Sequence, residues 1–207
     1  MTFATITPTR NDRPEFDAFC RHQLDRMEVK PTKSYFVDYA PTGPGFDLIP
    51  RVKEGIRMAQ ADGIDLVFIV ENDDFYPKDY FNHIPDTYFI GDRKTIYYNL
   101  KNRTHQDWDH PRRASLFTTG FRISAMVDFE WPADTEQFLD ISIWRYAVNH
   151  HKLMVFRETG AIGIKHGIGL CGGKGHIQRN KHLDSDMGWL KEHTDTEAFT
   201  FYSTIKL

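Results

Sequence analysis

The sequence has little cysteine, no long apolar run and little net charge. Its two cysteines, Cys20 and Cys171, lie far apart in 207 residues. This spacing excludes a disulfide framework or a cysteine-rich metal site and favours a reducing compartment. No segment approaches the ~20 apolar residues of a membrane span, and the first residues lack a signal-peptide pattern, so we expect a cytoplasmic protein. A net charge of -3 argues against binding nucleic acid or membranes through bulk charge, while local basic patches stay open.

The first part of the chain contains alternating strand and helix patterns. Short apolar strands are predicted at residues 3–7, 35–37 and 66–70, and amphipathic helices at residues 12–27 and 49–59 lie between them. This order predicts an α/β fold with a mostly parallel sheet and helices on both faces. A chain of 207 residues with 40% apolar residues suits a single domain over residues 1–207.

The later part of the sequence is less regular. Four further strands are predicted: residues 87–90, 95–100, 116–121 and 153–157. A helix is predicted over residues 136–149, with Asp134 or Thr135 as its N-cap. Residues 160–176 include seven glycines, too many for a helix or a central strand. We expect a mobile lid there, and the alternative is an ordinary surface connection.

Three carboxylates follow the most apolar strand directly: Glu71, Asp73 and Asp74. Ligands bind at the carboxyl ends of parallel strands, and strand alternation would point Glu71 and Asp73 to one side. Two carboxylates at that edge suit Mg²⁺ or Mn²⁺, which commonly bind substrate phosphates as well. The alternative interpretation is a solvated acidic turn that closes a strand.

Taken in order, these elements resemble those of the GT-A glycosyltransferases, and of family 2 most closely. Residues 7–11 resemble the opening strand and turn of that family, and Asp38 resembles the aspartate that meets the nucleotide base. Residues 53–59 resemble the helix that leads to the metal-binding DxD motif, where this chain has residues 71–74. Two differences are the glutamate in the first DxD position and the missing aspartate and serine after Asp38. The resemblance covers residues 3–81 well and the remainder loosely.

The resemblance implies a GT-A-like fold in which residues 1–100 bind the nucleotide sugar and residues 101–207 form a small irregular acceptor and lid half. The donor would be a nucleoside diphosphate sugar, and we expect a UDP sugar. A bound Mn²⁺ or Mg²⁺ would be held by Asp73 with Glu71 and His166. The residues expected to bind the donor are Thr7, Pro8, Thr9, Arg10, Asp38, Glu71, Asn72 and Lys174. Arg179 and Lys181 would assist Lys174 at the diphosphate.

An inverting reaction in this family also needs a general base for the acceptor hydroxyl. The resemblance favours Asp140 for this role, with Glu136 as the reserve. The alternative for Asp140 is a helix-surface carboxylate paired with a base, and a lone histidine such as His166 is often a surface or core residue.

The acceptor is less well defined. Basic and aromatic side chains alternate between residues 93 and 113, and this mixture suits either a saccharide or a nucleic acid strand. These side chains are Arg93, Lys94, Tyr97, Tyr98, Lys101, Arg103, Trp108, Arg112 and Arg113. We expect the acceptor to be a glycan or a hydroxylated nucleic acid base.

Two other function classes fit part of the pattern. A metal-dependent nucleotidyltransferase uses a similar core and carboxylate pair, but it would carry a glycine-rich basic turn after the first strand. The turn at residues 8–12 has no glycine. A noncatalytic nucleotide-binding module would use the acids only as turn formers.

Overall fold

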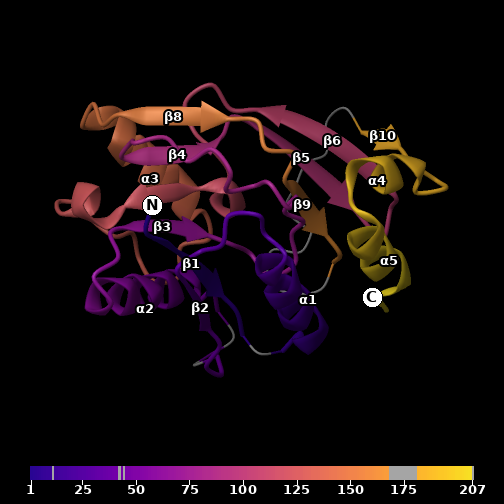
Figure 1. Cartoon of the computed structure of the whole chain (residues 1–207), viewed down its shortest axis with the longest axis horizontal. Coiled ribbons are helices and arrows are strands. Elements are labelled where there is room, and N and C mark those ends of the chain that lie inside the picture. Colours follow the sequence, from indigo (N-terminus) through magenta and orange to yellow (C-terminus); the bar gives the residue numbers. More distant parts are fainter. Residues whose placement is uncertain (11, 42, 44, 168–180, 207) are drawn as a thin grey trace.

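The computed structural model describes residues 1–10, 12–41, 43, 45–167 and 181–206. Its elements are β1 (Phe3–Pro8), α1 (Pro14–Asp25), β2 (Lys33–Val37), α2 (Leu48–Ala61), β3 (Leu66–Ile69), β4 (Phe89–Asp92), β5 (Lys94–Asn99), β6 (Thr104–Asp109), the 3₁₀ helix η1 (Leu116–Thr118), β7 (Gly120–Arg122), the 3₁₀ helix η2 (Ile123–Met126), α3 (Leu139–Asn149), β8 (Met154–Arg157), β9 (Ile162–Lys165), β10 (His182–Leu183), α4 (Gly188–His193) and α5 (Thr196–Thr204). They form two sheets that lie side by side (Figure 1).

The larger sheet has six strands in the order β2-β1-β3-β7-β4-β8. Only β7 runs antiparallel to its neighbours, and the pairs β1–β2, β1–β3 and β4–β8 are parallel. This arrangement confirms the predicted α/β fold with a mostly parallel sheet. Parallel strands place their carboxyl ends at one edge, so the residues after β1, β2 and β3 meet there.

Alternation along β1 and β3 directs side chains to helices on opposite faces of this sheet. Ile6 and Val67 belong to the apolar cluster that includes residues of α2 and α3, whereas Phe3 and Phe68 belong to the cluster that includes residues of α1. The contact between α2 and β1 is tight, because a Cβ at Gly55 would lie 2.4 Å from Cγ2 of Ile6. Both faces of the sheet are therefore covered, as the periodicity predicted.

The smaller sheet has four strands in the order β10-β6-β5-β9. Helices α4 and α5 pack on it through a cluster that also includes Phe16 and Phe19 of α1. Both sheets take strands from each side of residue 100. The chain beyond residue 181 thus contains two helices and a short strand that the sequence patterns did not indicate.

Several predicted boundaries were wrong. Helix α3 begins at Leu139 with Phe138 as its N-cap, because residues 133–136 form a turn closed by a hydrogen bond from the Glu136 amide to the Ala133 carbonyl. Helix α1 begins at Pro14, a residue well suited to a first helical turn, with Arg13 as its N-cap, and so it starts two residues later than predicted.

Residues 116–121 form a 3₁₀ turn followed by β7 instead of one strand. Cys20 is a buried free thiol, and Cys171 lies outside the described residues. In the described part of the chain, no helix combines the length and apolarity that a bilayer crossing requires.

Candidate functional site

The acidic segment after β3 is a turn and does not extend the strand. Strand β3 ends at Ile69, and the Asp74 amide donates to the Glu71 carbonyl at 3.3 Å. Strand alternation therefore no longer governs the direction of Glu71 and Asp73. Glu71 lines a cavity with residues from the later part of the chain, whereas Asp73 contacts Arg13 and His166.

Asp73 and His166 form one polar cluster with Arg13. His166 Nε2 lies 2.7 Å from Asp73 Oδ2, and Arg13 Nη1 lies 3.0 Å from each of these two atoms. Burial alone would raise the pKa of the Asp73 carboxyl, but the His166 hydrogen bond and the Arg13 charge together lower it below its ordinary value. Asp73 therefore stays ionised at neutral pH.

Buried and partly buried hydrogen bonds hold this cluster in place. Arg13 Nη2 donates to Asn72 Oδ1 at 3.1 Å, and the Asn72 amide donates to Asp17 Oδ1 at 2.6 Å. Asp17 on α1 also accepts from the Thr9 hydroxyl at 3.0 Å. Thr9 and Asn72 thus join the end of β1 to the acidic turn and α1. Both were predicted to bind the donor.

Asp74 faces the smaller sheet. Its side chain is fully buried, and its Oδ1 accepts from the Ile164 amide of β9 at 2.7 Å. Burial first, and then the charge of Asp73, raise the pKa of this carboxyl well above its ordinary value. Asp74 therefore connects the acidic turn to β9.

A cavity of about 300 Å³, here named the central cavity, opens beside the acidic turn. It is lined by Leu48, Glu71, Tyr97, Arg113, Ser115, Leu116, Gln137, Phe138, Asp140, Ile141 and Lys165. Burial raises the pKa of Glu71 to about 7, although the Lys165 charge opposes this shift. Asp140, in the first turn of α3, accepts a hydrogen bond from Arg113 Nη1 at 2.5 Å. Burial raises its pKa as well, against the charge of Arg113.

Lys165 is a functional candidate that sequence reasoning missed. Lys165 lines the central cavity, and its ammonium lies 4.9 Å from the centre of the Tyr97 ring. Burial would lower its pKa, but the charges of Asp74, Glu71 and other neighbours outweigh burial and raise it above the ordinary value. Its only sequence signal was its position directly before His166. The structure thus places a side chain that stays positively charged at the carboxyl edge of the larger sheet.

Four further predicted donor residues lie in β1 or just after β1 and β2. Arg10 donates to the Gly43 carbonyl at 3.0 Å and lies 3.5 Å from Asp47. Asp38 is exposed and lies 4.0 Å from Arg21. Two further donor candidates end β1: Thr7 is buried and Pro8 is half-buried.

Glu136 and the predicted lid complete the set of sequence candidates. Glu136 is exposed, its Oε1 accepts from the Gln137 amide at 2.9 Å, and it is not among the residues lining the central cavity. Lys174, Arg179 and most of the predicted lid lie outside the described residues.

The predicted metal ligands fit a divalent cation in part. A carboxylate oxygen of Asp73 and an imidazole nitrogen of His166 already converge, and this donor set suits Mn²⁺. Within the described ranges, however, no three His, Cys, Asp or Glu side chains are grouped to hold a metal ion. Glu71 lines the cavity instead, and the Arg13 guanidinium contacts both converging atoms. A metal at this point would require Arg13 to move and would take its remaining ligands from substrate or water.

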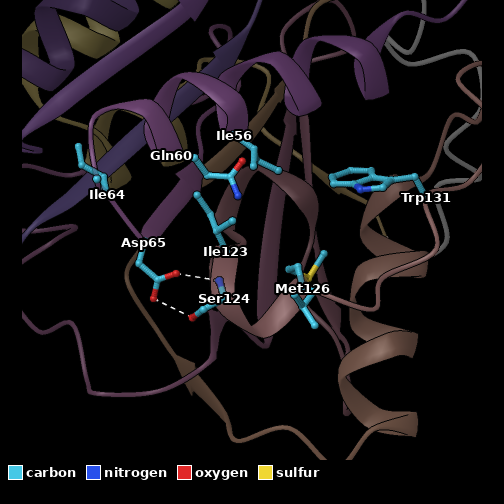
Figure 2. Close-up of a pocket in the computed structure, with 10 residues that line it drawn as sticks. Ile56, Gln60, Ile64, Asp65, Ile123, Ser124, Met126 and Trp131 are labelled. Atoms are coloured by element: carbon cyan, nitrogen blue, oxygen red, sulfur yellow. Dashed lines mark hydrogen bonds between the residues drawn. The ribbon is translucent and has the colours of Figure 1, made fainter.

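A larger cavity of about 520 Å³ lies beside the amino end of β3 (Figure 2). Its lining is mostly apolar and includes Ile56, Ile123 and Trp131. The Asp65 carboxylate at its edge accepts from the amide and the hydroxyl of Ser124 at 2.7 and 2.9 Å. Because this carboxylate already accepts hydrogen bonds from Ser124, it is less available to a ligand than the charged side chains at the carboxyl edge.

Comparison with known proteins identifies solved structures with a similar fold. No protein-family model and no curated protein sequence matches the chain. Among solved structures, TarS 1–349 of S. aureus in complex with UDP-GlcNAc matches with a TM-score of 0.52 and 13% identity, over 86% of this chain and 62% of that one. A197 from STIV matches with a TM-score of 0.48 and 11% identity, over 77% of this chain and 83% of that one. The nucleoside-diphosphate-sugar pyrophosphorylase of Vibrio cholerae RC9 matches with a TM-score of 0.39 and 10% identity, over 99% and 81%. The likeness to the TarS structure shows a GT-A-like α/β fold, and the chain spans less than two thirds of that structure.

Proposed function

We propose that the chain is a glycosyltransferase that moves a sugar from a nucleoside diphosphate sugar, UDP-linked, to a hydroxyl acceptor. The observation that carries this proposal is the central cavity, which brings Glu71 and Lys165 at the carboxyl edge together with Asp140 of α3. Donor-side charge and a candidate base therefore border the same space. The sequence resemblance to family 2 and the fold likeness to a structure containing UDP-GlcNAc both support a nucleotide-sugar donor.

Each charged group has a distinct role in this proposal. Lys165 neutralises negative charge that builds up on the departing diphosphate, which is the kind of electrostatic stabilisation that lowers a transition-state energy. Asp140 takes the proton of the acceptor hydroxyl as that oxygen attacks the anomeric carbon. Arg113, which donates to Asp140, positions this carboxylate. Glu71, with a pKa raised to about 7 by burial, can donate or accept a hydrogen bond at the ribose.

The proposal includes a divalent cation at Asp73 and His166. When bound, such an ion would supply a Lewis acid for the diphosphate. The protein side of the site consists of the Asp73 carboxylate and the His166 imidazole, and the Arg13 guanidinium, which contacts both, would move aside for the ion.

The donor is tested by thermal unfolding with a panel of nucleotide sugars, with and without Mn²⁺. A ligand that binds only the native state raises the unfolding temperature by mass action. We expect the largest shift with a UDP sugar and Mn²⁺, and free UDP as the product once an acceptor is present. Release of pyrophosphate would instead indicate nucleotidyl transfer. If no nucleotide sugar changes the unfolding temperature, the proposed function is wrong.

A further inference from the structure

A second cavity, here named the arginine cavity, adjoins the central cavity and has a volume of about 310 Å³. It is lined by His110, Pro111, Arg112, Arg113, Ile141, Trp144, Arg145, Val148 and Asn149. The two cavities share Arg113 and Ile141. Because Arg113 donates to Asp140, a ligand in the arginine cavity would lie next to the proposed general base.

The charge of this cavity is one-sided. Among the described residues that line it, three are arginines and none is an aspartate or a glutamate. Arg112 and Arg145 are exposed, and neither has an ion-pair or hydrogen-bond partner for its side chain in the described part of the chain. Burial, and then the Arg113 charge, lower the pKa of His110 to about 4. His110 is therefore neutral at pH 7, and the positive charge comes from the guanidinium groups.

Guanidinium groups in this number match a phosphate better than a carboxylate. Their N–H groups form a planar fork that binds phosphate oxygens bidentately, and a phosphate ester offers more acceptor oxygens and more charge. Arg113 already shares its charge with Asp140, so Arg112 and Arg145 remain for the ligand. The expected ligand therefore carries a phosphate group.

The lining also favours a small phosphate ester over a nucleic acid strand. Sequence-tolerant binding of single strands depends on aromatic faces on which bases stack. Of the two aromatic rings among the described lining residues, Trp144 is only 1% exposed and donates from its Nε1 to the Thr119 hydroxyl at 2.9 Å, and the His110 imidazole is buried as well. The cavity thus supplies charge and hydrogen-bond donors without a stacking platform.

We infer that the arginine cavity binds the phosphate group of the acceptor, a phosphorylated sugar or polyol, and holds its hydroxyl toward Asp140. This inference rests on the proposed function and names the acceptor class for the same site. Arg112 and Arg145 bind this phosphate, while Arg113 lies between the phosphate and the Asp140 carboxylate.

The test compares glycerol 3-phosphate with glycerol, which offers the same kind of hydroxyl without the phosphate. Isothermal titration is performed on the wild type saturated with UDP, on the double variant Arg112→Gln/Arg145→Gln, and on Arg57→Gln as a control. Arg57 is an exposed arginine of α2 outside both cavities. We expect glycerol 3-phosphate to bind at least about tenfold more tightly than glycerol, and the double variant to lose this difference, as two charge-assisted contacts predict. The control should match the wild type.

A single-stranded oligonucleotide is titrated in parallel. Three outcomes would overturn the inference: no preference for glycerol 3-phosphate, an unchanged preference in the double variant, or binding of the oligonucleotide alone. UDP binding is measured for the same proteins. Absence of UDP binding by the wild type would refute the proposed function. Normal UDP binding without a phosphate preference would refute only the acceptor assignment.

Discussion

Asp73 and His166 lie 93 positions apart in the sequence, and their side chains meet at 2.7 Å between Oδ2 and Nε2. The contact joins the turn after β3 to the end of β9, so it links the two sheets at the carboxyl edge. Arg13 Nη1 lies 3.0 Å from both atoms and adds a third chain segment. An arginine and a divalent cation cannot occupy this position together.

The first prediction is that Arg13→Gln tightens Mn²⁺ binding by about tenfold, equivalent to ~1.4 kcal/mol. The variant removes a positive charge that competes with the ion for Asp73 and His166. Isothermal titration with Mn²⁺ measures the effect, with Arg10→Gln as the matched control because Arg10 contacts Gly43 and Asp47 instead. Equal or weaker Mn²⁺ binding by a folded Arg13→Gln protein would contradict the prediction.

The second prediction concerns the base. Asp140→Asn should slow sugar transfer by about a hundredfold or more while UDP affinity stays near the wild-type value, because a positioned base acts in the chemical step. The amide keeps an oxygen that can accept from Arg113. Glu136→Gln is the control, since Glu136 is not among the residues lining the central cavity. Wild-type turnover by Asp140→Asn together with slow turnover by Glu136→Gln would transfer the role to Glu136.

A third prediction tests whether Lys165 binds the diphosphate or only supports the fold. Lys165→Met should weaken UDP binding by at least about tenfold and leave uridine binding unchanged, because the lost contact is to the diphosphate. Lys165→Arg keeps the charge and should recover much of the loss. Lys94→Met serves as a control, since Lys94 is exposed and pairs with Glu158 at 3.1 Å. A parallel loss of uridine affinity in Lys165→Met would point to misfolding of the cavity.

The fourth prediction is a pH dependence of stability. Burial, and then Arg113, lower the pKa of His110 from 6.5 to about 4 in the folded chain, with the Asp109 charge opposing the shift. Between these values the unfolded chain binds the proton and the folded chain does not, so stability is lost as pH falls from about 6.5 towards 4. Urea unfolding at pH 7 and pH 5 measures the loss, which should be smaller in His110→Gln. An identical pH response of the variant and the wild type would exclude His110 as the source.

Local patterns were sufficient to predict the elements from β1 to β3. The strands and helices from β1 to β3 were predictable because each has an apolar face whose period is visible in a short window. The start of α3 was not, because the turn at residues 133–136 closes through backbone atoms. The smaller sheet depends on pairing between β5 and β9 and between β6 and β10, which are distant in sequence. A pattern within a short window cannot predict which distant strands will pair.

The sequence by itself determined the composition of the acidic turn and its place after a buried strand, and the family resemblance indicated Asp73 and His166 as metal-ligand candidates. Only the tertiary structure decided that Asp73 contacts Arg13, that Glu71 shares a cavity with Asp140, and that Lys165 supplies charge there. The physical reason is that direction after a strand end is set by backbone turns and buried hydrogen bonds. Side-chain periodicity ends where the strand ends, at Ile69, and the chemistry of this site begins after it.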